Sequence, residues 1–247
     1  MADGEPGGNP LDGRKPGHRT NALIITLDGP AGAGKTSAAR GLARRLGFRY
    51  LDTGAMYRVV TLEALEQGID LNDEAAVAGV AASIEVRLEE DRVFSNGRDV
   101  TEAIRRTKVT LGSRPIAANA EVRRRLVELQ REVARGGNLV TEGRDQGTVV
   151  FPDAECKFFV IADPAERARR RQAELRERGE QVSLETVLAQ QEDRDRRDRQ
   201  RAVGPLIPAA DAIHVDTTRV PLEEVIDDLE RIVRKRVEER PGRRDQG

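Results

Sequence analysis

Short apolar runs alternate with amphipathic stretches along most of this chain. Five apolar runs bounded by polar or turn-forming residues predict buried strands at residues 23–28, 48–52, 138–142, 155–162 and 212–216. Apolar residues at helical spacing predict helices at residues 36–46, 54–67 and 118–134, and a final amphipathic helix carrying Leu222 to Val233. Strands that alternate with helices form a parallel sheet with both faces covered, so the pattern predicts an α/β fold.

One segment departs from this alternation. Residues 84–88 alternate apolar and polar side chains, residues 92–94 continue the pattern, and Asn96-Gly97 supplies a tight turn. We therefore expect a small antiparallel insertion. The pattern alone fits a surface hairpin without function equally well.

Residues 163–204 are nearly all charged and carry the signals of two helices. Asp163-Pro-Ala-Glu166 is a capping box with proline at the first helical position, and Gly179 ends that helix. Ser183 caps the second helix. Such helices are commonly solvated faces, but two of them in succession suit a lid that closes over a polyanion and excludes water.

The composition limits the kinds of molecule that this protein is expected to bind. The chain has 247 residues and a formal net charge of -1, so no global field recruits nucleic acid or a membrane surface, and we expect neither as a partner. Cys156 is the lone cysteine, which favours a reducing, cytoplasmic compartment. His18 and His214 are far apart and supply no histidine cluster for zinc. No apolar run approaches the roughly 20 residues that span a bilayer.

The most specific motif lies directly behind the first predicted strand. The segment Gly29-Pro-Ala-Gly-Ala-Gly-Lys-Thr36 fits the phosphate loop G-x-x-x-x-G-K-[ST], whose backbone amides surround phosphate oxygens. The predicted ATP-binding residues are Gly29, Pro30, Ala31, Gly32, Ala33, Gly34, Lys35, Thr36 and Ser37. Lys35 adds a positive charge, and a hydroxyl of this loop is placed to ligate Mg²⁺.

Arginine spacing gives a second candidate. Arg194, Asp198 and Arg201 follow the spacing i, i+4 and i+7, which puts two guanidinium groups and an intervening carboxylate on one helix face. Asp198 can orient both arginines. An ordinary surface ion-pair ladder explains the same spacing.

Two further candidates follow predicted strands. Asp52-Thr-Gly-Ala-Met-Tyr-Arg58 comes after the second strand, and Glu142-Gly-Arg-Asp145 ends a later one. Open parallel sheets place ligands at the carboxyl ends of their strands. We expect both segments to lie beside the phosphate loop, where Glu142 holds Mg²⁺ through water, Arg144 bridges two phosphates and Asp145 accepts a hydrogen bond from a base.

Four long motifs in this order resemble the bacterial-type cytidylate kinases. They are GPAGAGKT from Gly29, LDTGAMYR from Leu51, EGRDQGTVVFPDA from Glu142, and the stretch from Asp193 to Ala212. The resemblance covers residues 23–233 and implies the P-loop nucleoside monophosphate kinase fold. That fold has a five-stranded parallel sheet flanked by helices, a small antiparallel insertion in the acceptor-binding region and a helical lid.

The resemblance also implies a division of the chain. A single kinase domain is expected at residues 22–238, followed by a C-terminal tail at 239–247, and the Gly- and Pro-rich composition of residues 1–21 predicts a disordered tail there. The acceptor-binding insertion falls at about 70–125 and the lid at about 163–203.

Roles for residues follow from the same resemblance. It implies catalytic roles for Lys35, Arg144, Arg194 and Arg201. It implies CMP binding by Thr53, Tyr57, Arg58, Ser113, Arg123, Arg144, Asp145, Arg194, Asp198 and Arg201. The acceptor phosphate meets the arginines, Asp198 meets the sugar hydroxyls, and Asp145 with Arg123 meets the cytosine edge. Mg²⁺ is held by Thr36 or Ser37, with Glu142 acting through water.

The expected activity is phosphorylation of CMP and dCMP by ATP with Mg²⁺, in a protein that acts as a monomer. Cytosine presents an amino donor at position 4 where uracil presents an oxygen, so a carboxylate at Asp145 favours CMP over UMP. Two alternatives remain open. One is a P-loop kinase for another small acceptor, UMP or a shikimate-like molecule, and the other is a non-catalytic nucleotide-binding module.

Overall fold

A five-stranded parallel sheet forms the centre of the computed structural model, which describes residues 22–89 and 91–239. Its strand order is β2 (Arg49–Asp52), β6 (Leu139–Gly143), β1 (Ile24–Asp28), β7 (Cys156–Ile161) and β8 (Ile213–Asp216). All neighbouring strands pair in parallel. The predicted α/β fold and its strands are confirmed, while the expected tail at 1–21 and all of the expected tail at 239–247 except Glu239 lie outside the described residues.

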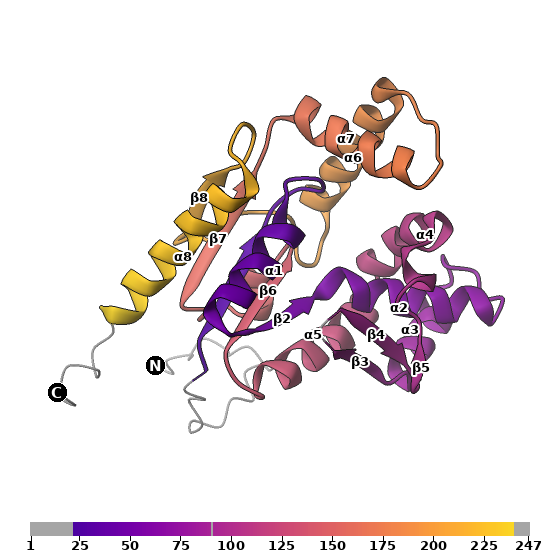
Figure 1. The fold of residues 1–247 in the computed structure, drawn as a ribbon. Helices are drawn as coiled ribbons and strands as arrows, with labels where there is room; N and C mark the ends of the chain where they lie inside the picture. The colour runs from indigo at the N-terminus through magenta and orange to yellow at the C-terminus, as the bar shows by residue number, and fades with distance from the viewer. Residues whose placement is uncertain (1–21, 90, 240–247) are drawn as a thin grey trace, which may run out of the picture.

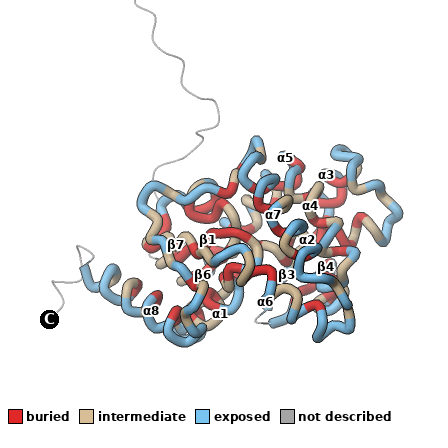
Figure 2. Tube along the Cα trace, turned by 90° about the horizontal axis from the view of Figure 1, so that it is seen from above, coloured by how far each residue is buried: buried red, intermediate tan, exposed pale blue. Residues whose placement is uncertain are grey.

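Helices cover both faces of this sheet (Figure 1). On one face, Ile25 and Leu27 of β1 pack with α1 (Lys35–Leu46) and α8 (Leu222–Glu238). On the other face, side chains from β2 and β6 join a second apolar cluster with α2 (Thr53–Glu66) and α5 (Ala120–Ala134). Buried segments accordingly run through the sheet and the inner faces of these helices (Figure 2). The alternating pattern of the strands thus fixes which helix covers which face.

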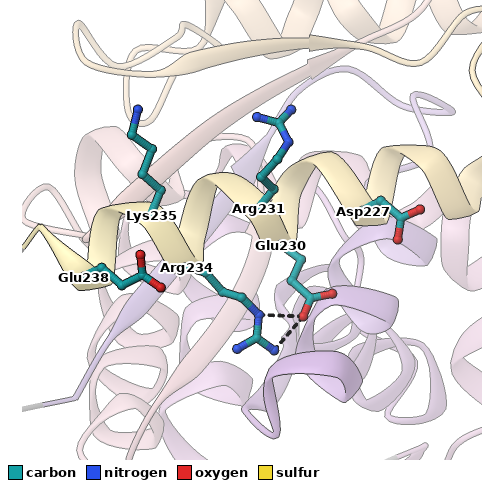
Figure 3. A pocket seen from close by; sticks show the side chains of 6 residues that line it. All are labelled: Asp227, Glu230, Arg231, Arg234, Lys235 and Glu238. Atoms are coloured by element: carbon teal, nitrogen blue, oxygen red, sulfur yellow. Dashed lines mark hydrogen bonds and ion pairs between the residues drawn. The ribbon is translucent and has the colours of Figure 1, made fainter.

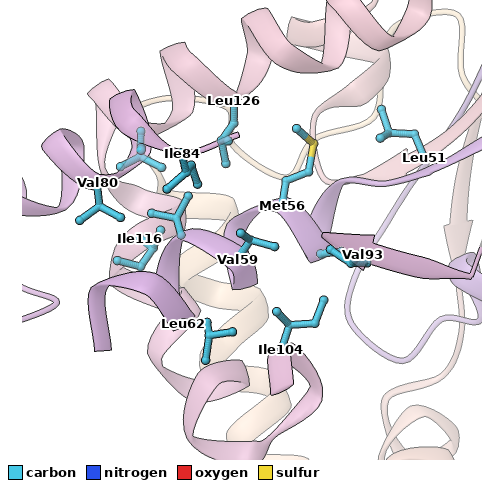
Figure 4. Close-up of a cluster of buried hydrophobic side chains, with 14 of the residues drawn as sticks. Leu51, Met56, Val59, Leu62, Val80, Ile84, Val93, Ile104, Ile116 and Leu126 are labelled. Carbon is cyan, nitrogen blue, oxygen red and sulfur yellow. The ribbon is translucent and has the colours of Figure 1, made fainter. Parts of the chain in front are cut away.

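The expected antiparallel insertion is present between α2 and α5, and it is larger than a hairpin. Its sheet consists of β3 (Val86–Glu89), β4 (Arg92–Ser95) and β5 (Arg98–Asp99), with the Asn96-Gly97 turn at positive φ between the last two strands. It also contains α3 (Glu74–Ser83), the 3₁₀ turn η1 (Ala103–Arg105) and α4 (Thr107–Ala118), none of which the pattern predicts. These elements bury Val80, Ile84, Ile104 and Ile116 against α2 (Figure 4).

The helix expected from residue 118 begins at Ala120 instead. Asn119 separates it from α4, and its side chain accepts hydrogen bonds from the amides of Glu121 and Val122. Asparagine is a strong helix N-cap, so the chain starts a new helix at this point.

The two predicted charged helices are α6 (Pro164–Glu177) and α7 (Leu184–Gln200), which form a hairpin after β7 (Figure 1). Asp163 and Ser183 cap them as expected. Ala168, Leu175 and Val187 are buried between the helices, so each has one apolar stripe within its charged surface.

The carboxyl ends of three neighbouring strands lie level with one another. Asp52 is opposite Glu142 between β2 and β6, and Asp28 is opposite Gly143 between β1 and β6. The phosphate-loop segment follows β1 directly, so the expected convergence of strand ends is confirmed. Among the helices of residues 22–89 and 91–239, none has the length and apolar character needed to cross a bilayer.

Candidate functional site

The segment between β1 and α1 adopts a tight loop that depends on glycine. Gly29, Gly32 and Gly34 all have positive φ. A Cβ atom on Gly29 would overlap the carbonyl oxygen of Val160 in β7, so this position also requires the absence of a side chain. Such a loop turns successive amides inward at the N-terminus of α1, which is the arrangement that binds phosphate.

Lys35, the first residue of α1, is buried within this loop. Its Nζ donates to the carbonyl oxygen of Pro30 at 2.6 Å, so the side chain folds back along the loop. Burial, with the nearby charges of Arg144 and Arg194, lowers the pKa of Lys35 to about 7. A buried amine held among other cations is stabilised in its charged form by an incoming anion.

Three arginines gather around Asp198 near Lys35. Arg144 Nε donates to Asp198 Oδ2 at 2.8 Å, and Arg201 pairs with Oδ1 of the same carboxylate. Arg194 lies beside them, and burial, together with Arg144, lowers its pKa to about 10. Three arginines therefore share the Asp198 carboxylate, while Glu142 and Asp28 are the carboxylates that act on Lys35.

The prediction made from the helical spacing of Arg194, Asp198 and Arg201 was wrong in two details. Arg201 is the residue after α7, with extended backbone, and does not lie on the helix. The second arginine that Asp198 orients is Arg144, 54 residues away in sequence, and not Arg194. The carboxylate thus joins the end of β6 to the end of α7.

Asp145 and Arg123 form a buried ion pair next to the arginine cluster. Their side chains are only 5% and 3% exposed. Arg123 also donates to the hydroxyl oxygen of Tyr57 at 3.3 Å. Gly204 covers the pair so closely that a Cβ atom there would overlap both charged groups. These residues come from four separate parts of the chain, and three of them, Tyr57, Arg123 and Asp145, are predicted CMP ligands that the structure brings together.

Thr36 and Glu142 meet beside the phosphate loop. The Thr36 hydroxyl donates to Glu142 Oε1, and the Tyr50 hydroxyl donates to the same oxygen at 3.1 Å. Hydroxyl and carboxylate oxygens are hard ligands of the kind that Mg²⁺ prefers, so this donor set fits the metal. Of the two hydroxyls that the sequence left open, that of Thr36 and not of Ser37 contacts Glu142.

The remaining predicted residues lie on α2 and α4. Thr53 Oγ1 donates to the Glu142 carbonyl oxygen at 2.7 Å, and Arg58 pairs with Asp52 at 3.0 Å. Ser113 is buried on α4, where its hydroxyl donates to the Thr110 carbonyl oxygen at 2.8 Å, within its own helix.

Sequence reasoning missed a second buried ion pair beside the loop. Arg167 of α6 pairs with Asp195 of α7 at 2.6 Å, and both side chains are at most 4% exposed. Arg167 also donates to the carbonyl oxygen of Ala31 at 3.0 Å. The pair joins the α6–α7 hairpin to the phosphate loop. Its partners are 28 residues apart, so no local spacing reveals it.

A hollow on the surface of α8 provides a contrast. Charged side chains of both signs line it: Asp227, Glu230, Arg231, Arg234, Lys235 and Glu238 (Figure 3). Arg234 donates to Glu230 at 2.8 Å, and Arg231 pairs with Asp228 at 2.6 Å. These exposed charges neutralise one another, so the hollow differs from the group of buried cations around Asp198.

Comparison with known proteins agrees with this geometry. The family model described as cytidylate kinase matches residues 25–235. A cytidylate kinase from Desulfitobacterium hafniense (strain Y51) is 51% identical over 219 residues, 87% of this chain and 94% of the relative. One from Rhodopirellula baltica (strain DSM 10527 / NCIMB 13988 / SH1) is 48% identical over 216 residues, with the same coverage.

Among solved structures, an uncharacterized protein from Eubacterium ventriosum ATCC 27560 aligns with a TM-score of 0.50 at 13% identity. The alignment covers 86% of this chain and 98% of that chain, and this likeness concerns the fold alone. The family match spans the phosphate loop, the arginine cluster and the Arg123–Asp145 pair together. The chain belongs to the cytidylate kinase family.

Proposed function

We propose that the protein transfers the γ-phosphoryl group of ATP to CMP and dCMP, giving CDP and dCDP. The observation that carries this proposal is the group of buried cations at the strand ends, where burial and the charge of Arg144 lower the pKa of both Lys35 and Arg194. Phosphoryl transfer requires positive groups around the equatorial oxygens of the transferring group. The cluster supplies them between the two proposed nucleotide sites.

The phosphate loop binds the donor in this proposal. Its amides and Lys35 hold the β- and γ-phosphates, and Thr36, with Glu142 acting through water, would hold Mg²⁺. The bound metal would neutralise charge on the donor phosphates. Lys35 then has an anionic partner in place of the Pro30 carbonyl oxygen.

The acceptor phosphate binds the arginines on the other side of the cluster. Four arginines surround it, because each guanidinium group can donate two hydrogen bonds to phosphate oxygens. They are Arg58, Arg144, Arg194 and Arg201. Asp198 already accepts from Arg144 and Arg201 and so fixes both forks. Its remaining lone pairs accept hydrogen bonds from the sugar hydroxyls.

Cytosine is recognised by the buried pair in this assignment. Asp145 accepts from the amino group at position 4, Arg123 donates to the ring acceptors, and Tyr57 packs beside them. Ser113 completes the base site. The oxygen at position 4 of uracil would face the carboxylate of Asp145, which disfavours UMP.

Two parts of the fold enclose the nucleotides. We assign acceptor binding to the insertion at residues 70–125 and a lid to residues 163–203, which include α6 and α7. The Arg167–Asp195 pair holds this hairpin on the phosphate loop, where closure excludes water from the transferring group. We expect the protein to act as a monomer on two small substrates.

A panel of acceptors tests the proposal. With ATP and Mg²⁺, we expect turnover of CMP and dCMP well above UMP, AMP and shikimate in a coupled assay that measures ADP. A kinase for a shikimate-like acceptor would prefer shikimate. A non-catalytic nucleotide-binding module would turn over none of them. Equal rates with CMP and UMP would overturn the assignment of Asp145.

A further inference from the structure

Asp28, the last residue of β1, links the two halves of the site. It directly precedes the phosphate loop and is 4% exposed. Its Oδ1 accepts from the amide of Gln146 at 2.8 Å, and its Oδ2 accepts from the amide of Gly147 at 2.7 Å. Both amides belong to the turn that follows Arg144 and Asp145. A single carboxylate therefore joins the start of the phosphate loop to the segment that carries two proposed acceptor ligands.

The turn itself has an uncommon conformation. Residues 146–150 form the π-helical turn η2, and such turns are rare and frequently occur at functional sites. The first amides of any helix lack acceptors within the helix. Asp28 supplies acceptors to the first two residues of η2 from a neighbouring strand, and so acts as a remote cap.

Side chains on the opposite side also anchor this turn. Thr141 Oγ1 donates to Gln146 Oε1 at 3.0 Å, and Gln146 Nε2 donates to Gln130 Oε1 at 3.1 Å. Arg131 donates to the carbonyl oxygens of Val149 and Val150, each at 3.0 Å. The backbone at residues 145–150 is therefore held from both sides, which fixes the direction in which Arg144 and Asp145 leave it.

Burying the Asp28 carboxylate at this position costs free energy, because the charged group loses its contact with water. Burial raises the pKa of Asp28 to about 6, despite the two amide hydrogen bonds that lower it. The charge of Asp145 adds to this effect, and that of Lys35 opposes it. A buried carboxylate whose hydrogen-bond partners are neutral amides keeps part of its desolvation cost. Its position between the two substrate sites suggests a role beyond stability.

We propose that Asp28 is a positioning residue for acceptor recognition: its carboxylate fixes the turn that directs Arg144 and Asp145 at the acceptor nucleotide, in register with the phosphate loop. This inference rests on the proposed function, because it requires Arg144 and Asp145 to contact the acceptor. Asp28 itself touches neither substrate.

Asp28→Asn tests the inference with little change in size. The asparagine oxygen still accepts from one amide, but its NH₂ group faces the other amide and leaves it unpaired. We expect kcat/KM for CMP to fall about 5- to 150-fold, mainly through KM, as for one lost buried hydrogen bond. The preference for CMP over UMP should fall with it, while KM for ATP stays within about twofold, the change expected when no contact to the donor is lost.

A measurement without substrates accompanies the kinetics. Hydrogen exchange of the Gln146 and Gly147 amides should be faster in Asp28→Asn than in the parent protein, because the Asp28 carboxylate that accepts from both is replaced by a weaker acceptor. Thr141→Val removes a different anchor of the same turn and leaves the phosphate loop intact, so it should change acceptor KM in the same direction. Asp73→Asn is the matched control. Asp73 caps α3 by accepting from the Ala76 amide at 3.0 Å, and Asn caps helices equally well.

Including Asp145→Asn in the panel separates two kinds of failure. If Asp145→Asn keeps the parent's preference for CMP over UMP, Asp145 does not contact the base, and the proposed recognition of cytosine is wrong. If Asp145→Asn loses the preference while Asp28→Asn keeps the parent's acceptor kinetics and exchange rates, the positioning role of Asp28 is wrong. A defect in Asp28→Asn confined to ATP would also overturn it. If Asp28→Asn does not fold, parental acceptor kinetics in Thr141→Val decide against the inference.

Discussion

Replacing Asp145 by asparagine separates the structural and the recognition roles of the buried Arg123–Asp145 pair. The substitution keeps the shape of the side chain and removes its charge. Because Arg123 is only 3% exposed, water cannot readily replace the lost partner. Both stability and substrate preference should therefore change, and the structure gives a separate magnitude for each.

The stability change follows from the partners that Arg123 retains. Breaking a buried pair by removing one charge costs about 3–5 kcal/mol. Arg123 keeps contacts to the Tyr57 hydroxyl at 3.3 Å and to the Ala117 carbonyl oxygen at 3.5 Å. Burial also raises the pKa of Asp145 in spite of Arg123, so this carboxylate is itself costly. We therefore expect Asp145→Asn to lose about 3 kcal/mol of stability, the lower end of this range. For a chain of this size, Tm should then fall by about 6–12 °C.

The change in preference follows from hydrogen-bond polarity. With Asp145, the position-4 oxygen of UMP meets another acceptor, at a cost of about 1–3 kcal/mol, or about 5- to 150-fold in kcat/KM. Asparagine offers both a donor and an acceptor. The ratio of kcat/KM for CMP to that for UMP should therefore fall by most of this factor in Asp145→Asn.

Asp195→Asn is the matched control for this experiment. It breaks the other buried pair, with Arg167, whose side chains are as buried as those of Arg123 and Asp145. We expect it to lower Tm by a similar amount, measured by circular dichroism, and to leave the CMP to UMP ratio unchanged. If the ratio is the same in the parent and in Asp145→Asn, or falls equally in both variants, Asp145 does not read the base.

Three further predictions concern the loop, the cover of the base site and pH. Lys35→Ala should abolish turnover while circular dichroism stays native, and retained activity would show that Lys35 does not stabilise the transferring group. Gly204→Ala should raise KM for CMP more than KM for ATP in steady-state kinetics, because Gly204 has positive φ and its Cβ would displace the Arg123–Asp145 pair; equal effects on both would contradict this. Burial raises the pKa of Asp28 from 3.8 to about 6, so its contribution to stability is present below about pH 4 and is lost as pH rises through 6. The free energy of urea unfolding of the parent minus that of Asp28→Asn should therefore fall by about 2 kcal/mol from pH 4 to pH 7, and a difference that stays constant with pH would refute the raised pKa.

The sheet was predictable from the sequence, whereas half of the insertion was not. Strands buried on both faces are short apolar runs, and these stand out between amphipathic helices. Helix α4 contains Gly112 and Pro115, two residues that disfavour helix in isolation. A Cβ atom on Gly112 would lie 2.7 Å from Leu71 and 3.1 Å from Thr61, so the glycine permits close packing of α4 on α2. Tertiary packing overrides local propensity at this helix.

The candidate site was predictable as a set of residues and not as a set of contacts. Motifs name Arg144, Asp145 and Asp198 because each lies in a recognisable segment. Helical spacing reports only neighbours within one helix, so it assigned the second arginine on Asp198 to Arg194. The observed partner, Arg144, comes from a strand end 54 residues away, and only the folded sheet brings it there.

In a chain where all but five of the 42 basic residues are arginine, sequence position cannot separate binding arginines from surface ones. Burial and partner charge do separate them. Arg124 is 64% exposed and is held by Glu121 and Glu128 on its own helix, so its charge is neutralised in water. Burial and the charge of Arg144 lower the pKa of Arg194 although Asp198 opposes them, so an added anion would stabilise its charge further. Burial together with neighbouring cations thus distinguishes the arginines around Asp198, and this supports the proposal that they bind phosphate.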